Sequence, residues 1–154
     1  MASDYFAKAI NINLIGSFNI CKAAANIMQN NEADVDGQRG VLINTASVAA
    51  YEGQIGQSAY SASKAGIIGM TLPMAREFTR IGVRVMTIAP GVFMTPMVSG
   101  MPEKVKEALA ANVPFPSRLG QPEEFASTVA HIIETTYLNG SVIRLDGAIR
   151  LEPK

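Results

Sequence analysis

The chain has 154 residues, of which 48% are hydrophobic and 17% are charged, and its 13 basic and 13 acidic side chains give a formal net charge of zero. This size and composition are typical of one soluble globular α/β domain, and without a cluster of Lys and Arg there is no signal for nucleic acid or an anionic membrane surface. The single cysteine excludes an internal disulfide, the spacing of Cys and His predicts no metal site, and no apolar run is long enough to span a membrane.

The first predicted element is a helix that begins at Ser3, with Ser3 and Asp4 as its N-cap, and runs to about residue 28. Its apolar residues recur at helical spacing and would form one stripe: Leu14, Ile15, Phe18, Cys21, Ala25 and Met28. A polar loop over 29–40 separates this helix from an apolar run over 41–46, which predicts a buried strand. Because that run is continuously apolar rather than alternating, we expect a sheet covered on both faces.

The second half of the chain repeats the alternation of helix and buried strand. A helix is predicted from Ser58 to about Arg80, ended by Gly82, and a second buried strand over 83–88. The remaining predicted elements are a short helix near 103–112, a helix from Pro122 to about Thr135 and a last strand over 141–145. This pattern predicts a single α/β domain over 1–154, built as part of a doubly wound parallel sheet with about three strands and flanking helices.

Three polar side chains are predicted to meet at the end of the first strand. Tyr60 and Lys64 are four residues apart on the second helix and therefore share one of its faces. Ser47 follows the strand, at the edge where open α/β sheets bind ligands. A Tyr-x-x-x-Lys pair alone is a weak signal, because a surface tyrosine can stack on a lysine stem by chance. Its placement beside a strand that ends in serine favours a site for proton transfer to or from an oxygen.

Other chemistry-bearing residues have plainer interpretations. His131 is interpreted as a packing or surface residue of the third long helix, and Cys21 as a small hydrophobic side chain. A hydrolase that uses Ser47 and Lys64 is conceivable, since serine–lysine pairs occur in proteins. No nucleophile elbow of the G-x-S-x-G kind is present in the sequence, which disfavours that alternative.

Four segments resemble the classical short-chain dehydrogenases/reductases: A-I-N-I-N-L-I-G-S-F (9–18), V-L-I-N-T-A-S (41–47), Y-S-A-S-K (60–64) and R-V-M-T-I-A-P-G-V-F-M-T-P (84–96). Within this family the chain looks closest to the type-2 3-hydroxyacyl-CoA dehydrogenases, also known as type-10 17β-hydroxysteroid dehydrogenases. That similarity rests on N-T-A-S-V-A-A-Y-E-G-Q-I-G-Q, V-P-F-P-S-R-L-G and N-G-S-V-I-R-L-D-G-A-I-R. The resemblance implies an NAD-dependent oxidoreductase of lipid metabolism that interconverts a secondary alcohol and a ketone, on substrates of acyl-CoA or steroid type.

The resemblance also implies a role for each site residue. Tyr60 would be the general acid/base, and the positive charge of Lys64 would favour its phenolate form while the lysine also binds the nicotinamide ribose. Ser47 would hold the substrate oxygen, and Asn13 would bind a water of the proton relay, although an exposed polar role for Asn13 fits the sequence equally well. The resemblance also implies cofactor-binding residues at the nicotinamide end, namely Pro90, Gly91, Phe93 and Thr95. It implies two substrate-binding residues, Gln54 and Gln57.

A methionine-rich segment follows the second strand. Met94, Met97 and Met101 lie in a loop that, with the short helix after it, would form a substrate lobe over about 92–120. Flexible methionine side chains adapt to an acyl chain or to a flat apolar ring system. Simple filling of the core is the alternative that the sequence leaves open.

The sequence departs from the family in its cofactor-binding part. The Gly-rich phosphate loop and the acidic residue that bind the pyrophosphate and adenosine ribose are not found in it. By the resemblance the chain begins at the family's fourth helix and represents the C-terminal part, roughly the last three-fifths, of a Rossmann-type domain. The preference for NAD over NADP therefore comes from the resemblance alone.

This departure predicts exposed apolar surface. We expect the first strand to lie at an open sheet edge and the first two helices to leave apolar faces uncovered. In the family the corresponding helices form the main dimer contact, often within a tetramer, so the resemblance implies a homo-oligomer in the mitochondrial matrix or the cytoplasm. A truncated, non-catalytic interaction module that associates with full-length subunits is the alternative to an active enzyme.

Overall fold

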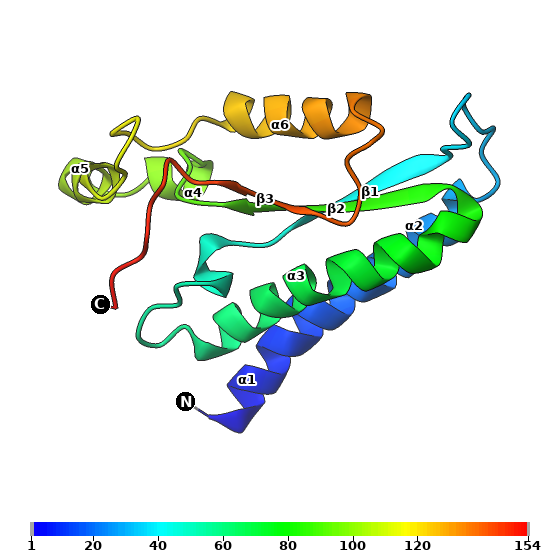
Figure 1. The fold of residues 1–154 in the computed structure, drawn as a ribbon. Helices are drawn as coiled ribbons and strands as arrows, with labels where there is room; N and C mark the ends of the chain where they lie inside the picture. The colour runs from blue at the N-terminus through cyan, green and yellow to red at the C-terminus, as the bar shows by residue number, and fades with distance from the viewer. Residues whose placement is uncertain (1, 154) are drawn as a thin grey trace.

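The computed structural model describes residues 2–153 and has three layers, with a parallel sheet between two sets of helices (Figure 1). The strands are β1 (Gly40–Thr45), β2 (Val83–Pro90) and β3 (Val142–Leu145), in the order β1-β2-β3. The helices are α1 (Ser3–Ala9), the π-helical η1 (Ile10–Ile15), α2 (Gly16–Met28), the 3₁₀-helical η2 (Val48–Ala50), α3 (Ser58–Phe78), the 3₁₀-helical η3 (Thr79–Ile81), α4 (Pro96–Ser99), α5 (Glu103–Ala111) and α6 (Pro122–Glu134). The predicted α/β fold with three parallel strands and flanking helices is confirmed.

The central strand β2 is buried on both faces. Val83 and Val85 pack with Met74 of α3 and Cys21 of α2 in one cluster. On the opposite face, Met86 and Ile88 pack against Ile132 of α6. Because side chains alternate along a strand, the continuous apolar run is explained by helices on both sides of the sheet. The strand β1 pairs with β2 alone among the described residues, so it lies at a sheet edge as predicted.

The long first helix is interrupted, and its predicted N-cap is wrong. The cap is Ala2, with extended backbone and no side-chain hydrogen bond, so neither Ser3 nor Asp4 caps the helix. The π-helical segment η1 then separates α1 from α2. Segments of this kind insert an extra residue into a helix and shift which side chains face a neighbour. Within α2 the predicted stripe is buried at Cys21 and Ala25 but 47% exposed at Phe18.

The helix α3 ends where the sequence predicts. It passes into η3 and then Gly82, whose φ of 68° is left-handed. A Cβ atom at this position would clash with the carbonyl oxygen of Gly37 in the preceding loop. Glycine is therefore required both by the backbone conformation and by the close approach of that loop.

A buried arginine on β2 holds the end of α6. Arg84 is 6% exposed, and its guanidinium group donates to the carbonyl oxygens of Ile132 (3.0 Å), Ile133 (3.1 Å) and Leu138 (2.7 Å). A cation at the C-terminus of a helix satisfies carbonyl groups that lack a helical partner and interacts favourably with the helix dipole. Burial lowers the pKa of Arg84, an effect partly opposed by the charge of Asp34.

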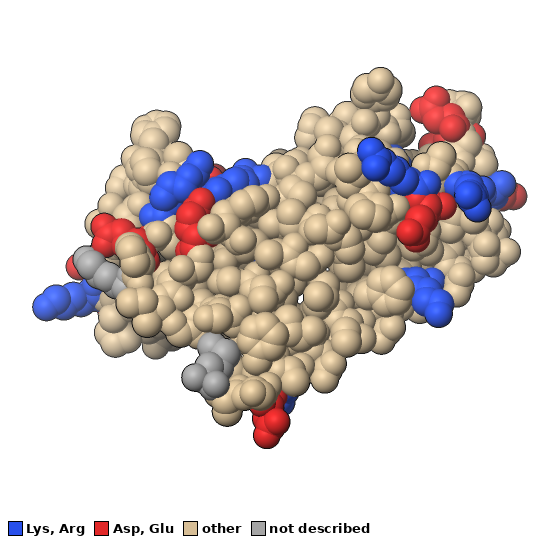
Figure 2. Space-filling model, turned by 60° about the horizontal axis from the view of Figure 1, so that its bottom comes forward, with Lys and Arg blue, Asp and Glu red and all other residues tan. Residues whose placement is uncertain are grey.

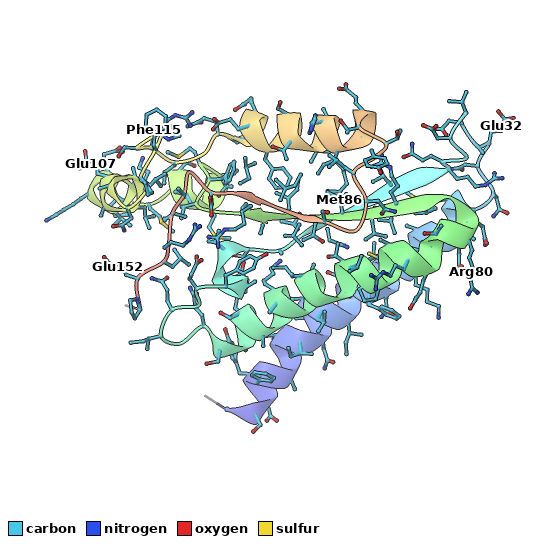
Figure 3. All side chains as sticks on the ribbon, viewed as in Figure 1. Glu32, Arg80, Met86, Glu107, Phe115 and Glu152 are labelled. Carbon is cyan, nitrogen blue, oxygen red and sulfur yellow. The ribbon has the colours of Figure 1, made fainter. Side chains whose placement is uncertain are left out.

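The loops that follow the strands gather at one end of the molecule. Glu107 of α5, Phe115 and Glu152 lie at the carboxyl end of the sheet, whereas Glu32 and Arg80 lie at the opposite end (Figure 3). Open parallel sheets bind their ligands at the carboxyl end of the strands. That end also holds the predicted site residues at Ser47 and beyond Pro90.

Candidate functional site

Tyr60 and Lys64 lie on one face of α3, next to the end of β1. Lys64 Nζ donates a hydrogen bond to the backbone oxygen of Thr45 at 2.9 Å and lies 5.8 Å from the centre of the Tyr60 ring. Burial lowers the pKa of Lys64 from its usual value, because a half-buried ammonium group loses part of its hydration. The strand end thus holds the lysine beside the tyrosine, as the i, i+4 spacing predicts.

Two cavities meet at Tyr60. The smaller, of about 330 Å³, is lined by Ser47, Val48, Ala49, Gln54, Gln57, Tyr60, Gly91, Val92, Leu109, Asn112, Ile149, Arg150, Leu151 and Glu152. The larger, of about 730 Å³, is lined by Thr45, Gln57, Tyr60, Pro90, Gly91, Val92, Phe93, Thr95, Met97, Val98, Pro122 and Phe125. Both volumes are in the range of small-molecule sites. Tyr60 is 40% exposed and lines both cavities.

Ser47 lies in the smaller cavity at the start of η2. Its backbone is extended, and its Oγ accepts a hydrogen bond from the amide of Ala49 at 3.1 Å. A hydroxyl that accepts from the backbone keeps its own hydrogen for donation, so Ser47 can donate to an oxygen of a bound ligand. The structure therefore places Ser47 and Tyr60 around one volume.

Asn13 reaches Tyr60 through a serine that sequence reasoning did not single out. The side-chain nitrogen of Asn13, in η1, donates to Ser63 Oγ at 3.1 Å, and this hydroxyl donates to the backbone oxygen of Tyr60 at 2.7 Å. Ser63 is fully buried. Ser63 follows Tyr60 by three residues, so the sequence indicates that the two share a helix face. The sequence does not indicate the contact with Asn13, which lies 50 residues before Ser63. Asn13 lines neither cavity and is half-buried in contact with α3.

The loop after β2 forms the wall of the larger cavity with Pro90, Gly91, Phe93 and Thr95, all of which the sequence placed at the nicotinamide end. The ring of Phe93 packs edge-on against Phe125 of α6, with 6.1 Å between ring centres. A Cβ atom on Gly120 would lie within 2.8 Å of the Phe93 ring, so glycine there makes room for this packing. These contacts hold the loop against α6.

The two predicted glutamines line the smaller cavity and contact each other. Gln57 Nε2 donates to Gln54 Oε1 at 3.3 Å, and Gln54 Nε2 donates to the backbone oxygen of Glu152 at 3.1 Å. The C-terminal residues 149–152 and Asn112 also line this cavity. The sequence pattern did not indicate these residues, because nothing local shows that the C-terminal residues lie beside Gln54, which is 98 positions away from Glu152 in the sequence.

The methionine-rich segment is only partly buried. Met97 is 81% exposed and lines the larger cavity, so filling of the core does not explain this residue. Met94 and Met101 are half-buried. The segment therefore borders the larger cavity, whereas Leu109 and Asn112 further along border the smaller one.

Cys21 and His131, which the sequence assigns to packing or to the surface, line neither cavity. Cys21 is buried, and its Sγ donates to Asn44 Oδ1 at 3.2 Å. His131 is exposed on α6 with Nδ1 3.4 Å from the hydroxyl of Thr135. Over residues 2–153, no three His, Cys, Asp or Glu side chains gather closely enough to bind a metal ion, and no helix has the length and hydropathy needed to cross a membrane.

Comparisons with known proteins identify the family of this chain. A family model described as enoyl-(acyl carrier protein) reductase matches residues 1–149. The chain is 62% identical over 148 residues to 3-hydroxyacyl-CoA dehydrogenase type-2 of Rattus norvegicus and to that of Homo sapiens, covering 96% of this chain and 57% of each relative. A crystal structure of 3-hydroxyacyl-CoA dehydrogenase type-2 from Mycobacterium avium superposes with a TM-score of 0.94 at 48% identity, covering 97% of this chain and 58% of that one.

The chain therefore belongs to the short-chain dehydrogenase/reductase family of oxidoreductases, whose dehydrogenases use nicotinamide cofactors. Within the family it is similar to the 3-hydroxyacyl-CoA dehydrogenases of type 2. It spans 57% of the length of the rat and human relatives.

Proposed function

We propose that this chain contains the catalytic and substrate-binding part of an NAD(H)-dependent dehydrogenase that interconverts a secondary alcohol and a ketone, of the 3-hydroxyacyl-CoA or hydroxysteroid type. The observation that supports it most is the meeting of two cavities at Tyr60, with Ser47 in the smaller and the loop from Pro90 to Thr95 along the larger. The similarity to 3-hydroxyacyl-CoA dehydrogenases supports the choice of substrate class. The segment over about 92–120, which borders both cavities, is the proposed substrate lobe.

In this proposal the chain's residues transfer one proton and stabilise the negative charge that develops on the substrate oxygen. In the reductive direction Tyr60 donates its hydroxyl proton to the carbonyl oxygen of the substrate, and in the oxidative direction it accepts a proton from the alcohol. Lys64 lies near enough to stabilise the phenolate form electrostatically. Ser47 donates a hydrogen bond to the same substrate oxygen, which stabilises negative charge as it develops. When bound, the nicotinamide supplies or accepts the hydride.

The larger cavity fits the nicotinamide end of the cofactor. Its lining combines apolar side chains of Phe93, Val98 and Phe125 with the polar groups of Thr45 and Thr95, as expected around a flat ring that carries an amide. Lys64 is held beside this cavity by its hydrogen bond to the backbone oxygen of Thr45, and it would bind the ribose of the nicotinamide. Residues 2–153 contain no Gly-rich phosphate loop, so the choice of NAD over NADP rests on the similarity to the family. Asn13 is proposed to support the proton relay through Ser63.

A titration with NADH tests this proposal. Purified chain is titrated with NADH, followed by nicotinamide fluorescence, and then assayed with acetoacetyl-CoA as the simplest 3-oxoacyl thioester. We expect saturable binding and oxidation of NADH that depends on the thioester. The same titration with added longer relative, the rat 3-hydroxyacyl-CoA dehydrogenase type-2, is the comparison. No binding by the chain alone, together with co-assembly into the relative, would favour a non-catalytic interaction module instead.

An exposed apolar face supports association between subunits as a second element of the proposal. Large apolar side chains on α1, η1 and α2 are exposed to solvent, namely Tyr5 (63%), Ile12 (62%), Ile15 (46%) and Phe18 (47%). The face of the molecule that includes α1 carries its charged residues mainly towards the periphery and leaves a broad uncharged area (Figure 2). Large exposed apolar side chains on an uncharged face are typical of protein–protein interfaces. We propose a homo-oligomer through the first two predicted helices, which are the segment of α1, η1 and α2 over residues 3–28 and the helix α3, whether or not the chain is catalytic.

Phe18→Glu tests the proposed interface. A charge placed in an apolar contact removes buried area and adds a desolvation cost, so we expect the dimer to weaken by at least about 2 kcal/mol, or roughly thirtyfold. Sedimentation equilibrium over a range of concentrations measures the association. Tyr137→Glu is the control, because Tyr137 is 99% exposed in the loop after α6. A wild-type chain that sediments as a monomer at every concentration would reject the interface.

A further inference from the structure

Four charged side chains next to the smaller cavity form a network centred on Arg144 of β3. The guanidinium group of Arg144 donates to both carboxylate oxygens of Glu52, at 2.7 and 3.0 Å, and to Asp146 Oδ2 at 2.8 Å. Arg150 joins the same two carboxylates, at 3.5 Å from Glu52 and 3.3 Å from Asp146. Two positive and two negative charges therefore balance within one cluster.

Three of the four side chains are well enclosed, whereas that of Arg150 is 60% exposed. The Asp146 side chain is 9% exposed and those of Glu52 and Arg144 are 21% and 24% exposed. The guanidinium group also lies 4.9 Å from the centre of the Tyr51 ring. Two parallel hydrogen bonds between arginine and a carboxylate define both distance and orientation, which a single charge contact does not. The hydrogen bonds from Arg144 lower the pKa of Glu52, which keeps this carboxylate charged.

The network joins two segments that are far apart in the sequence. Glu52 belongs to the loop over 51–57, whereas Arg144 Nη2 donates to the backbone oxygen of Ile149 at 3.2 Å, at the start of the C-terminal segment over 149–153. Where these segments continue, Ile55 N donates to the backbone oxygen of Pro153 at 3.2 Å. The loop contributes Gln54 and Gln57 to the smaller cavity, and residues 149–152 contribute its facing wall.

The two cavities differ in their dependence on this network. The C-terminal segment lines the smaller cavity, whereas the larger cavity is bounded mainly by the loop after β2 and by α6 and shares Gln57 of the 51–57 loop with the smaller one. A change at Arg144 should therefore displace the C-terminal wall of the smaller cavity more than the wall formed by the loop after β2 and by α6, along which the cofactor is proposed to lie. Substrate binding should depend on this network more strongly than cofactor binding does.

We propose that Arg144 is a positioning residue for the substrate: it clamps the loop over 51–57 to the C-terminal segment over 149–153, and so builds the wall that holds a substrate against Tyr60 and Ser47. This inference rests on the proposed function, because it assigns the smaller cavity to the substrate. Arg144 touches neither cavity itself and acts through Glu52 and Ile149. Small displacements of a bound substrate have large kinetic effects, which is why such a clamp matters.

The test compares Arg144→Met with the wild-type chain in two measurements. Methionine keeps an apolar stem against Tyr51 but cannot bind the carboxylates. Hydrogen exchange followed by mass spectrometry should show at least about tenfold faster exchange of the amide of Ile55, because the hydrogen bond to Pro153 opens more often. The KM for acetoacetyl-CoA should rise roughly tenfold or more, while the Kd for NADH stays unchanged.

Three further variants sharpen the comparison. Glu52→Gln keeps the volume and one hydrogen bond, so it should show a smaller change of the same kind and serves if Arg144→Met folds poorly. Arg144→Lys restores the charge without the paired hydrogen bonds and should recover only part of the affinity. Arg118→Met removes another two-bonded arginine–glutamate pair, with Glu124 at 2.8 and 2.9 Å, and should leave the exchange of Ile55 unchanged.

The outcomes separate this inference from the function on which it rests. A wild-type chain without thioester-dependent oxidation of NADH would reject the proposed function, and the positioning role with it. A wild-type chain that turns over, with an unchanged KM in Arg144→Met, would overturn the positioning role alone, even if the exchange of Ile55 accelerates. A parallel loss of NADH affinity in Arg144→Met would also overturn it, since the clamp would then not be specific to the substrate side.

Discussion

Replacing Tyr60 by phenylalanine is expected to slow the reduction of acetoacetyl-CoA by roughly 10²- to 10⁴-fold. The phenyl ring keeps the packing at the junction of the two cavities but has no proton to transfer. The Kd for NADH should change little, because the ring itself and Lys64 remain in place. Steady-state kinetics under saturating NADH, with circular dichroism to verify the fold, measure the effect.

A matched tyrosine provides the control for this result. Tyr137 lies in the loop after α6 and away from both cavities, so Tyr137→Phe should leave turnover and fold unaffected. Ser47→Ala should give a smaller loss than Tyr60→Phe, because it removes a hydrogen bond to the substrate oxygen but not the proton donor. Full turnover in Tyr60→Phe would refute the assignment of Tyr60 as general acid/base.

Arg84→Met is expected to lower the free energy of unfolding by about 3 kcal/mol. The substitution leaves buried carbonyl oxygens at the end of α6 without their donor, including those of Ile132 and Leu138. The apolar side chain fits the stem of the arginine but cannot replace its hydrogen bonds. Urea denaturation followed by circular dichroism measures the difference, provided that the m-value is unchanged.

An exposed arginine provides the comparison for Arg84. Arg76 lies on the solvent side of α3, and Arg76→Met should change the free energy of unfolding by less than about 0.5 kcal/mol. Hydrogen exchange should localise the loss in Arg84→Met to the last turn of α6. Equal stability of the Arg84 and Arg76 variants would show that the contacts of Arg84 with α6 contribute little to the folded state.

Apolar periodicity predicted the secondary structure because it is a local property. The mainly apolar runs at 41–46 and 83–88 predicted two of the three strands, and residues of both strands pack in the observed core. Tyr60 and Lys64 could be paired from spacing alone, since residues four apart always share a helix face. Arg84 within a predicted buried strand had no explanation in the sequence, because the carbonyl groups that it binds come from residues 132–138.

Contacts between distant segments could not be predicted in this way. The π-helical interruption at η1 accompanies the packing of Asn13 on α3, through Ser63, which lies 50 positions further along. The same holds for Phe18, whose helical spacing predicted burial although no described element covers its side chain fully. Whether an apolar stripe is buried depends on the neighbouring element, and the stripe itself carries no information about that neighbour.

The sequence by itself determined the class of fold, the position of the strands and helices, and the chemical pairing of Tyr60 with Lys64 beside Ser47. These features follow from the period of apolar residues and from the fixed geometry of a helix. Only the tertiary structure decided that two cavities meet at Tyr60 and that the C-terminal segment closes one of them through Arg144. The physical reason is that cavities and charge networks form between elements, where their geometry depends on sheet order and packing rather than on local pattern.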